Sequence, residues 1–207
     1  GYGADPNACC ERIRALGCPC VQGNHDLAAI GAFDLEWFNE NARAAAEWTG
    51  RELTPENRAF LAGLPAVARG DGFQIVHGSL VNPIQEYLTD VQGARRCLDL
   101  QSEPVCFVGH THVPLAFSRR GDSLFCADVP FGPSSPVRLD PDCAYVVNCG
   151  AVGQPRDGEP EAACGILDTE AQTVVLIRVA YEIEATQSKI METGLPALLA
   201  ARLASGR

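Results

Sequence analysis

Residues 105–112 read Val-Cys-Phe-Val-Gly-His-Thr-His, an apolar run that leads directly into two histidines. Four consecutive apolar residues followed by glycine predict a short buried strand that ends near Gly109. If the backbone stays extended beyond this strand, His110 and His112 point to the same side, because side chains alternate along an extended chain. Two imidazoles on one side can bind one metal ion or two adjacent ions.

The two other histidines of the chain stand in similar places. His77 follows the apolar segment 73–76, and His25 follows the segment 18–22 within Gly23-Asn24-His25-Asp26. All four histidines are therefore predicted at the carboxyl ends of strands, where the loops of an open α/β sheet converge on one crevice. A single histidine at such a place is more often a hydrogen-bonded loop residue than a ligand, but four together favour one site.

The residues beside His25 add to this predicted site. The side-chain oxygen of Asn24 is a neutral ligand that leaves a bound cation strongly Lewis-acidic. Asp26 could orient the His25 ring and favour its protonated form.

The other elements form a sequence of helices, then strands mixed with helices, then a strand-rich half that ends in two helices. Prolines at the first turn of two helices and the turn at 70–72 mark some of the limits. We expect Ile13 and Leu16 to face inward, and we interpret the proline-rich segment 130–141 as a loop. The predicted helices are 6–17, 35–48, 54–63, 91–100, 182–192 and 196–204, and the predicted strands are 18–22, 66–69, 73–77, 105–108, 115–118, 123–127, 144–148, 163–168 and 173–178.

This order predicts an α/β sandwich with two packed sheets, formed by residues 1–207 as a single domain.

Several other polar and aromatic residues are expected to have structural roles. Asp140 and Asp168 stand near predicted turns and are interpreted as turn-formers. Trp37 and Trp48 are interpreted as core or surface-packing residues, as aromatic side chains usually are.

The charge of the chain restricts its partners. The formal net charge is −10 and the isoelectric point is about 4.8. Such a surface repels nucleic acid, whereas a small phosphorylated substrate held by cations remains compatible with it. No apolar run approaches the length that crosses a bilayer, so we expect no membrane partner. The sequence predicts no oligomeric state.

Ten cysteines are best explained as reduced thiols of a cytoplasmic protein. Four of them lie in apolar runs that predict buried strands: Cys106, Cys126, Cys149 and Cys164. Cys9 and Cys10 are predicted to face different ways on a helix. Cys18 and Cys20 form a C-x-C pair that could bind metal, but no second pair stands at the spacing of a zinc site.

The motifs G-N-H-D at 23–26, V-H-G at 76–78 and G-H-T-H at 109–112 resemble, in this order and spacing, the calcineurin-like metallophosphoesterases. Within that superfamily they look like the small bacterial and archaeal phosphodiesterases. Residues 1–7 resemble the stretch after the second metal-binding block of the family, and residues 148–158 resemble a loop that follows a late strand. The resemblance covers most of the chain and implies a four-layer α/β/β/α sandwich with two mixed sheets.

The resemblance also implies a role for each matched residue. Asn24, His77 and His110 would bind one metal and His112 the other, while His25, supported by Asp26, would stabilise the transition state or protonate the leaving oxygen. The implied reaction is hydrolysis of a phosphodiester or phosphomonoester by a hydroxide held between two metal ions about 4 Å apart. The ligand set does not choose among Mn, Fe, Zn, Ni and Co.

Arg156, in Gln154-Pro155-Arg156-Asp157-Gly158, has two interpretations. Its guanidinium could bind a substrate phosphate. It could equally be a loop arginine in a surface salt bridge.

The family pattern also includes an Asp-x-His pair on a first strand and a bridging Asp on a second, and both would lie upstream of Gly1. We expect this chain to be a truncated form of a complete enzyme, which lacks these N-terminal blocks and the first strands. The alternative is a natural short form: a catalytically inactive module that binds one metal, a nucleotide or a partner. A metal-dependent nuclease fits the acidic surface less well. Metal ligands upstream of Gly1 would distinguish the enzyme from the module.

Overall fold

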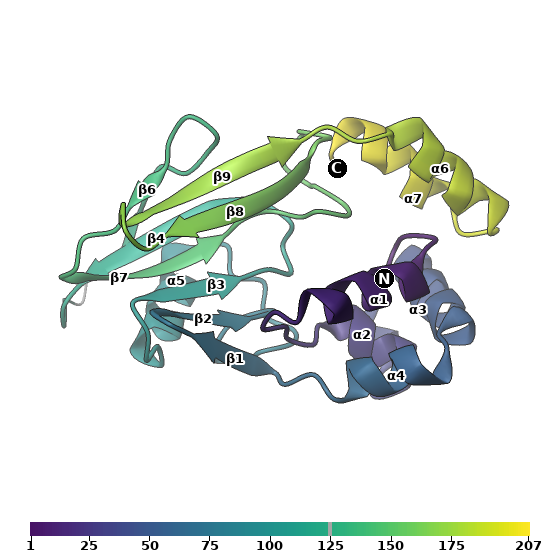
Figure 1. The fold of residues 1–207 in the computed structure, drawn as a ribbon, viewed down its shortest axis with the longest axis horizontal. Coiled ribbons are helices and arrows are strands. Elements are labelled where there is room, and N and C mark those ends of the chain that lie inside the picture. The colour runs from purple at the N-terminus through teal and green to yellow at the C-terminus, as the bar shows by residue number, and fades with distance from the viewer. Residues whose placement is uncertain (124–125) are drawn as a thin grey trace.

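A six-stranded sheet runs through the protein in this computed structural model, which describes residues 1–123 and 126–207 (Figure 1). Across the sheet the strands are β1 (Val67–Gly70), β2 (Phe73–Val76), β3 (Val105–Val108), β7 (Cys143–Asn148), β4 (Leu115–Arg120) and β5 (Ala127–Asp128). The neighbours β2, β3 and β7 are parallel, and the other pairs are antiparallel. Parallel strands end at the same edge, so the segments that follow β2, β3 and β7 meet there.

A second sheet packs on one face of the first. Its strands, in order, are β6 (Val137–Arg138), β9 (Thr173–Val179) and β8 (Ala162–Asp168), and both described pairs are antiparallel. A buried cluster between the sheets joins Val105 and Val147 of the large sheet to Val137 and Val174 of the small sheet. The predicted α/β fold with two packed sheets is therefore confirmed. The small sheet is antiparallel in the described residues, not mixed as expected.

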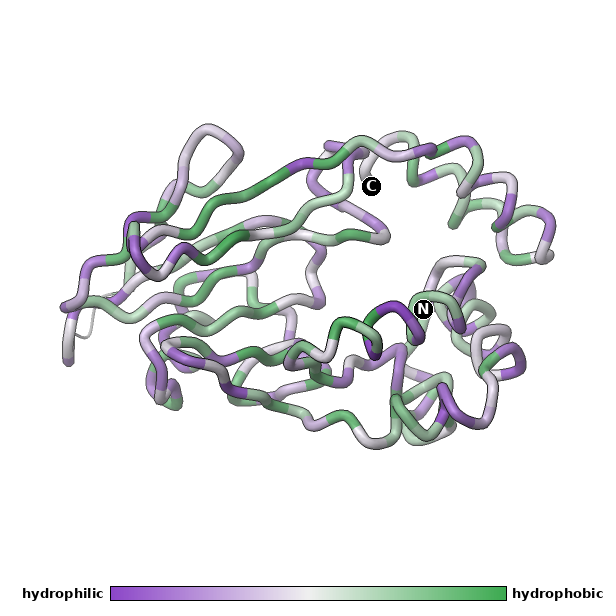
Figure 2. Tube along the Cα trace, in the orientation of Figure 1, coloured by the Kyte–Doolittle hydropathy of each residue, from purple (hydrophilic) through white to green (hydrophobic). Residues whose placement is uncertain are grey.

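The large sheet is buried on both of its faces. Helix α5 (Val91–Asp99) covers the face opposite the small sheet, where its Ala94 and Cys97 pack with Val146. Val146 and Val147 are adjacent and each is 0% exposed, because alternate side chains of β7 enter the two different clusters. The strands are accordingly apolar along most of their length (Figure 2), as expected for a doubly covered sheet.

The other helices gather at one end of the two sheets (Figure 1). The C-terminal helices pack on α3 through a buried cluster that includes Ala45, Ile190 and Leu199. The helical elements at this end are α1 (Pro6–Leu16), α2 (Asn24–Ala29), η1 (Leu35–Trp37), α3 (Glu40–Glu52), α4 (Pro55–Ala62), α6 (Ile183–Glu192), α7 (Ala197–Ala201) and η2 (Arg202–Ser205).

Most elements lie where the sequence predicts them, and the segment before the first motif does not. Residues 18–22 form no strand in the described structure. Pro19 has no N–H to donate to a ladder, and the N–H of Gln22 donates instead to the carbonyl of Pro65, at 3.0 Å. The next residues form a short helix, α2, that the sequence analysis missed. It begins where the Asp26 carboxylate accepts a hydrogen bond from the Gly23 N–H.

Three further predictions are wrong in detail. The helix predicted at 35–48 is split, because Phe38 is extended and the Asn39 side chain accepts from the Ala42 N–H at 3.0 Å to start α3. The loop at 130–141 contains the short strand β6. Ile13 and Leu16 are exposed rather than inward, since Cys10 is the single buried residue of α1. The strand predicted at 123–127 includes residues 124–125, which lie outside the described residues.

The cysteines agree with the sequence analysis in part. All ten are free thiols. Cys9 is exposed and Cys10 buried, as expected for residues that face different ways on α1, and Cys106 is buried in β3. Cys164 is exposed, contrary to expectation, because β8 lies at the edge of the small sheet and pairs with β9 alone in the described structure.

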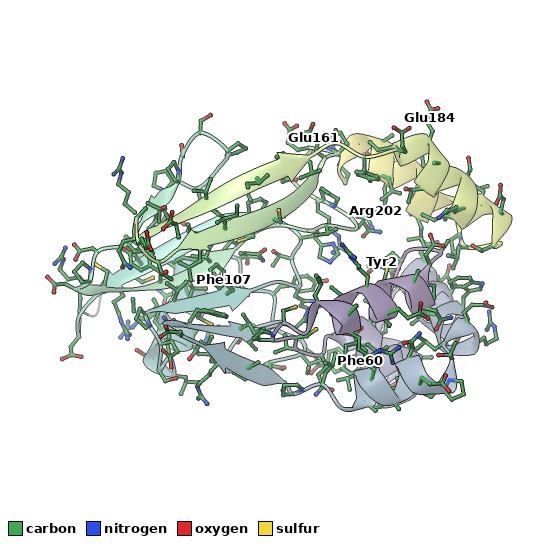
Figure 3. All side chains as sticks on the ribbon, in the orientation of Figure 1. Tyr2, Phe60, Phe107, Glu161, Glu184 and Arg202 are labelled. Carbon is green, nitrogen blue, oxygen red and sulfur yellow. The ribbon has the colours of Figure 1, made fainter. Side chains whose placement is uncertain are left out.

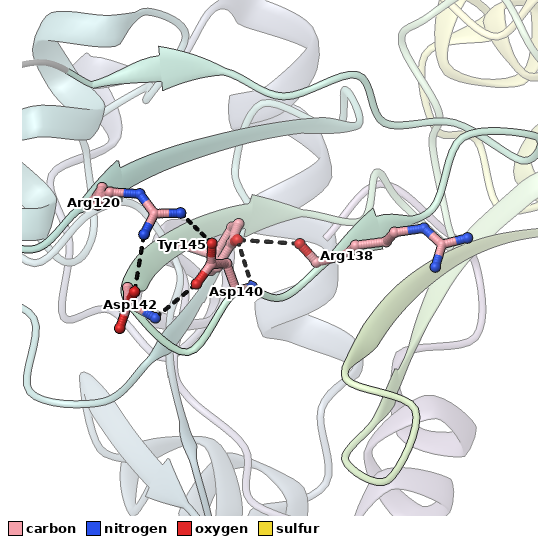
Figure 4. A network of polar contacts seen from close by, with 5 residues as sticks. All are labelled: Arg120, Arg138, Asp140, Asp142 and Tyr145. Atoms are coloured by element: carbon pink, nitrogen blue, oxygen red, sulfur yellow. Dashed lines mark hydrogen bonds and ion pairs between the residues drawn. The ribbon is translucent and has the colours of Figure 1, made fainter.

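A polar network fixes the turn that leads into β7 (Figure 4). The Tyr145 hydroxyl donates to the Arg138 carbonyl at 3.1 Å and accepts from the Asp140 N–H at 2.8 Å. Arg120 pairs with both Asp140 and Asp142. The Asp140 carboxylate also accepts from the Asp142 N–H at 2.9 Å, so its prediction as a turn-former is confirmed. The prediction of Asp168 as a turn-former is also confirmed, because its Oδ1 atom accepts hydrogen bonds from the N–H groups of residues 170 and 171.

None of the helices in the described chain combines the length and the apolar character needed to cross a bilayer. The assignment of residues 1–207 to a single domain stays a prediction.

Candidate metal centre

Two histidines meet because they follow neighbouring parallel strands. Phe73 to Ile75 of β2 align with Val105 to Phe107 of β3. One further hydrogen bond, from the Gly109 N–H to the His77 carbonyl at 2.8 Å, extends this pairing beyond the strands. His77 and His110 therefore leave the sheet edge side by side, with their ring centroids 4.6 Å apart.

Three side chains converge on one point at this edge. The Nε2 atom of His77 lies 3.0 Å from Oδ1 of Asn24 and 2.9 Å from Nδ1 of His110. Two ligand atoms that bind one ion at right angles, each about 2.1 Å from it, are separated by about 3 Å. The two measured separations match that value. We refer to Asn24, His77 and His110 as the donor triad.

The protonation state of the triad suits a cation. Burial lowers the pKa of His77 to about 3 and that of His110 to about 4. For His77 the neighbouring His110 lowers the pKa further. Neutral imidazole is the form that binds metal, so both rings offer lone pairs at neutral pH.

The donor set is short of carboxylates. Across the described residues, no group of three or more His, Cys, Asp or Glu side chains is placed to hold a metal ion. The donor triad is not such a group, because it consists of two histidines and an asparagine. The residues present therefore fit one divalent cation with neutral N and O ligands, and further ligands would have to complete its coordination.

The backbone at 109–112 is bent, not extended as the sequence analysis assumed. His110 and His112 both have left-handed φ angles, 64° and 62°. Asn148, at the end of β7, holds the bend: its amide donates to the Gly109 carbonyl at 2.8 Å and to the Thr111 hydroxyl at 2.9 Å. Left-handed conformations of non-glycine residues are strained and are maintained only where the surroundings impose them.

His112 stands outside the donor triad. Its Nδ1–H donates to the Gln154 carbonyl at 2.7 Å, which leaves Nε2 with a free lone pair. A backbone carbonyl on the second ring nitrogen is the usual arrangement for a histidine that binds metal. Burial, followed by the charge of Arg156, lowers the pKa of His112 to about 4. His112 therefore suits a second ion as a single donor.

His25 lies in the first turn of α2 between two aromatic rings. Its ring centroid is 4.3 Å from that of Tyr2 and 4.8 Å from that of Phe38. Its Nδ1 atom is buried and has no hydrogen-bond partner among the residues that the structure describes. Mainly because of this burial, the pKa of His25 is lowered to about 2. The environment therefore favours the neutral ring.

Asp26 acts on the helix rather than on the His25 ring. Its Oδ2 atom accepts from the Gly23 N–H at 2.7 Å and so caps α2. In the described structure no hydrogen bond joins it to His25. The expectation that Asp26 favours protonated His25 is thus not supported, and the catalytic roles of both residues stay predictions.

Arg156 extends over the same site with only neutral partners. Its guanidinium lies near the Gln154 side-chain oxygen, at 3.0 Å, and the Tyr2 hydroxyl, at 3.3 Å. It also stands over the Tyr2 ring, 5.6 Å from the centroid. No acidic side chain pairs with it in the described part of the chain, which argues against the surface salt-bridge interpretation. A second guanidinium, that of Arg202, belongs to the same end of the molecule as Tyr2 (Figure 3). Burial, and next the charge of Arg156, lower the pKa of Arg202.

One cavity of about 440 Å³ unites these groups. It is lined by the triad, by His25 and His112, and by Arg156 with Gln154 and Tyr2. The structure thus brings together every site residue that the sequence predicted, Asp26 included.

A model of the calcineurin-like phosphoesterase superfamily domain matches residues 4–172. The chain belongs to this superfamily. Its membership supports a phosphoesterase-type hydrolase in general, and it confirms the resemblance carried by the three histidine motifs.

Known proteins and structures are similar to the whole of this chain. An uncharacterized protein of Methanocaldococcus jannaschii, MJ0912, is 36% identical over 214 residues, which cover 100% of this chain and 83% of the relative. The crystal structure of a metallophosphoesterase from Sphaerobacter thermophilus is similar with a TM-score of 0.83 and 40% identity, over 100% of this chain and 84% of that one. A hypothetical protein of Pyrococcus horikoshii OT3, PH1004, shares the fold with a TM-score of 0.78 at 19% identity, over 100% and 82% of the chains.

Several residues that shape this site were not predicted. Tyr87 stacks on His110, with the ring centroids 4.0 Å apart and an angle of 15° between the ring planes. Tyr2 covers His25. Asn148 holds the bend and Gln154 orients His112. Tyr2, Asn148 and Gln154 lie in the segments 1–7 and 148–158 that resemble the family, but no role was predicted for them. Asn148 also carried a physical signal, since a buried polar residue at the end of a predicted strand needs a partner beyond it.

Proposed function

We propose that this calcineurin-like phosphoesterase is a divalent-metal-dependent hydrolase of small phosphodiesters or phosphomonoesters. One observation carries the proposal: Nε2 of His77 lies 3.0 Å from Oδ1 of Asn24 and 2.9 Å from Nδ1 of His110, in a cavity that also contains Arg156. Among the described residues, no acidic side chain pairs with this arginine. Such spacing suits a common cation, and the arginine suits an anionic substrate. The overall charge of −10 repels anions, so the binding of an anionic substrate depends on positive charge within the site itself.

The donor triad would hold one ion, and His112 would provide Nε2 to a second. Divalent cations bound there would supply Lewis acidity toward phosphoryl oxygens. The mixed N/O donors accept Mn, Fe, Zn, Ni or Co.

The chain's own groups would position the substrate. Arg156 would bind phosphoryl oxygens, with Gln154 and Tyr2 holding the guanidinium in place. His25 lines the cavity and would donate a hydrogen bond from its neutral ring toward the reacting phosphate. Because Asp26 is occupied by the helix cap, it would keep His25 in position through α2. The ten free cysteines agree with a reducing, cytoplasmic setting.

The test separates metal binding from catalysis. Metal content by mass spectrometry and hydrolysis of bis(p-nitrophenyl) phosphate would be measured for the protein loaded with Mn²⁺. His110→Ala should lose both metal and hydrolysis. His25→Ala should keep the metal and lose about 10²- to 10⁴-fold in rate. Arg43→Ala, in an exposed ion pair on α3, is the matched control and should match the unaltered protein. Full activity in His25→Ala would remove that residue from the mechanism.

A second candidate is a module that binds one metal ion or a nucleotide without hydrolysis. The lack of a carboxylate in the donor triad favours it, because two imidazoles and one amide oxygen leave a divalent cation short of the ligands that usually complete its coordination. About one equivalent of metal with no hydrolysis would support this candidate against the enzyme.

A further inference from the structure

A small aromatic hollow opens beside the metal centre. It has a volume of about 150 Å³, and five of its lining residues are aromatic: Tyr2, Phe33, Trp37, Phe38 and Tyr87. Asn24 and His110 of the donor triad line it as well. Tyr2, Asn24, Tyr87 and His110 also line the main cavity, so the hollow continues directly from the proposed phosphate site.

Two of the five rings form a fixed wall. Phe38 lies edge-on to His25 at 4.8 Å, and Phe33 lies edge-on to Phe38 at 5.8 Å. Their edges are thus used in contacts inside the protein.

The other side of the hollow offers unused aromatic surface. Tyr87 is 54% exposed although it stacks on His110, so the ring face turned away from His110 is open. Trp37 is 73% exposed at the end of the short turn η1, outside the buried clusters. This corrects its interpretation as a packing residue. Trp48, by contrast, packs in the cluster of α3, α6 and α7.

The polar groups of the hollow stand among these rings. The amide side chains of Asn39 and Gln85 line it, and no charged side chain does so in the described residues. An uncharged planar ring with polar edges matches such a surface, because it can stack on aromatic faces and bond to amides. The charged part of the same ligand would lie in the main cavity, beside Arg156.

We propose that the hollow binds the base of a nucleotide, so that the substrates of this site are nucleotide phosphoesters. The inference rests on the proposed function for the phosphate end of the ligand. Trp37 and Tyr87 are the positioning residues: they hold the base by stacking and place the phosphorus next to the donor triad.

A binding measurement tests the hollow without relying on turnover. The chain has two tryptophans, so Trp48→Phe leaves Trp37 as the only indole. This protein, loaded with Zn²⁺, would be titrated with adenosine 5′-monophosphate and with ribose 5-phosphate, which differ by the base. Adenosine 5′-monophosphate should quench Trp37 fluorescence and bind about 5- to 150-fold more tightly, the equivalent of 1–3 kcal/mol of stacking.

Variants assign the preference to the hollow. Calorimetry on Trp37→Ala should show nearly equal affinities for the two ligands, with that for ribose 5-phosphate unchanged, whereas Trp37→Phe should keep part of the preference. Leu100→Ala is the matched control, because Leu100 is 59% exposed and lies outside both cavities; it should keep the full preference.

The outcomes separate this inference from the proposed function. Equal affinities in the unaltered protein, or no binding of either ligand, overturn the nucleotide inference. Hydrolysis of bis(p-nitrophenyl) phosphate with equal affinities leaves the proposed function standing alone. A clear preference without hydrolysis supports the hollow and overturns the hydrolase proposal.

Discussion

Gly23 offers a direct test of how the donor triad is held. A methyl group built on Gly23 would lie 2.9 Å from both Cε1 and Nδ1 of His77. The backbone of Gly23, with φ −113° and ψ 177°, accepts alanine without strain. Gly23→Ala therefore acts on the position of the His77 ring rather than on the local backbone.

The size of the effect follows from the contact distance. Ordinary contacts of this kind begin at 3.4 Å, so the edge of the ring must move by about 0.5 Å, the difference between 3.4 and 2.9 Å. Nε2 is bonded to Cε1 and moves with it, whereas metal–ligand distances are tolerated within about 0.2 Å. Disturbing the group that orients a ligand typically weakens metal binding about 10- to 100-fold. We expect a loss in that range for Gly23→Ala.

The assay compares metal affinity with stability. Zn²⁺ affinity would be measured by competition with a chromophoric chelator, and the free energy of unfolding by urea titration without metal. Gly23→Ala should lower that free energy by about 1 kcal/mol, because alanine is a poorer N-cap residue than glycine.

Gly3→Ala is the matched control. Gly3 lines the same cavity, and a methyl group placed there meets no atom within 4 Å. Gly3→Ala should leave both the Zn²⁺ affinity and the free energy of unfolding unchanged. If Gly23→Ala bound zinc as tightly as the unaltered protein, His77 would not be a ligand in the position that the structure gives it.

Three other predictions concern stability. Asp157→Ala should lower the free energy of urea unfolding by about 1–3 kcal/mol, because the guanidinium of Arg178, with a side chain only 11% exposed, loses its ion-pair partner. A cost below about 0.5 kcal/mol, like that of the exposed pair of Arg43, would show that this pair is not needed. Leu88→Ala, at 1% exposure, should cost about 2–5 kcal/mol by calorimetry, against less than about 0.5 kcal/mol for the 56% exposed Leu198; equal costs would contradict the packing. In the metal-free protein all four histidines have pKa values of about 2–4, below the unfolded value near 6.5, so unfolded chains bind more protons in acid. The contribution of the neutral histidines to the free energy of unfolding should be fully present above about pH 6.5. It should fall toward pH 4, by up to about 1.4 kcal/mol per pH unit for each histidine. A urea midpoint that does not change between pH 7 and 5 would show that these histidines are not held neutral by burial.

The parts of the fold that could be predicted are those with local causes. The strand 105–108 was predicted at its observed limits, because four apolar residues before a glycine leave few alternatives. The segment 18–22 was predicted as a strand from similar local features and is not one. A strand requires a partner as well as a pattern, and no local sequence specifies that partner.

The site shows the same division. The meeting of His77 and His110 followed from their places at the ends of two strands, once those strands were parallel neighbours. The bend that separates His112 from them could not be predicted, because its cause lies elsewhere in the chain. Asn148, in another strand, provides the hydrogen bonds that hold 109–112.

That bend decides how the motif can work. An extended G-H-T-H would direct both imidazoles to one side of the strand, whereas two left-handed residues direct one ring to the donor triad and the other to Gln154. Each such residue costs about 1–3 kcal/mol, which the buried Asn148 bonds help to offset. The histidine ring that stays outside the triad keeps a free Nε2 in the same cavity as Arg156. The bent form thus separates the two donor positions that the proposed pair of cations would occupy.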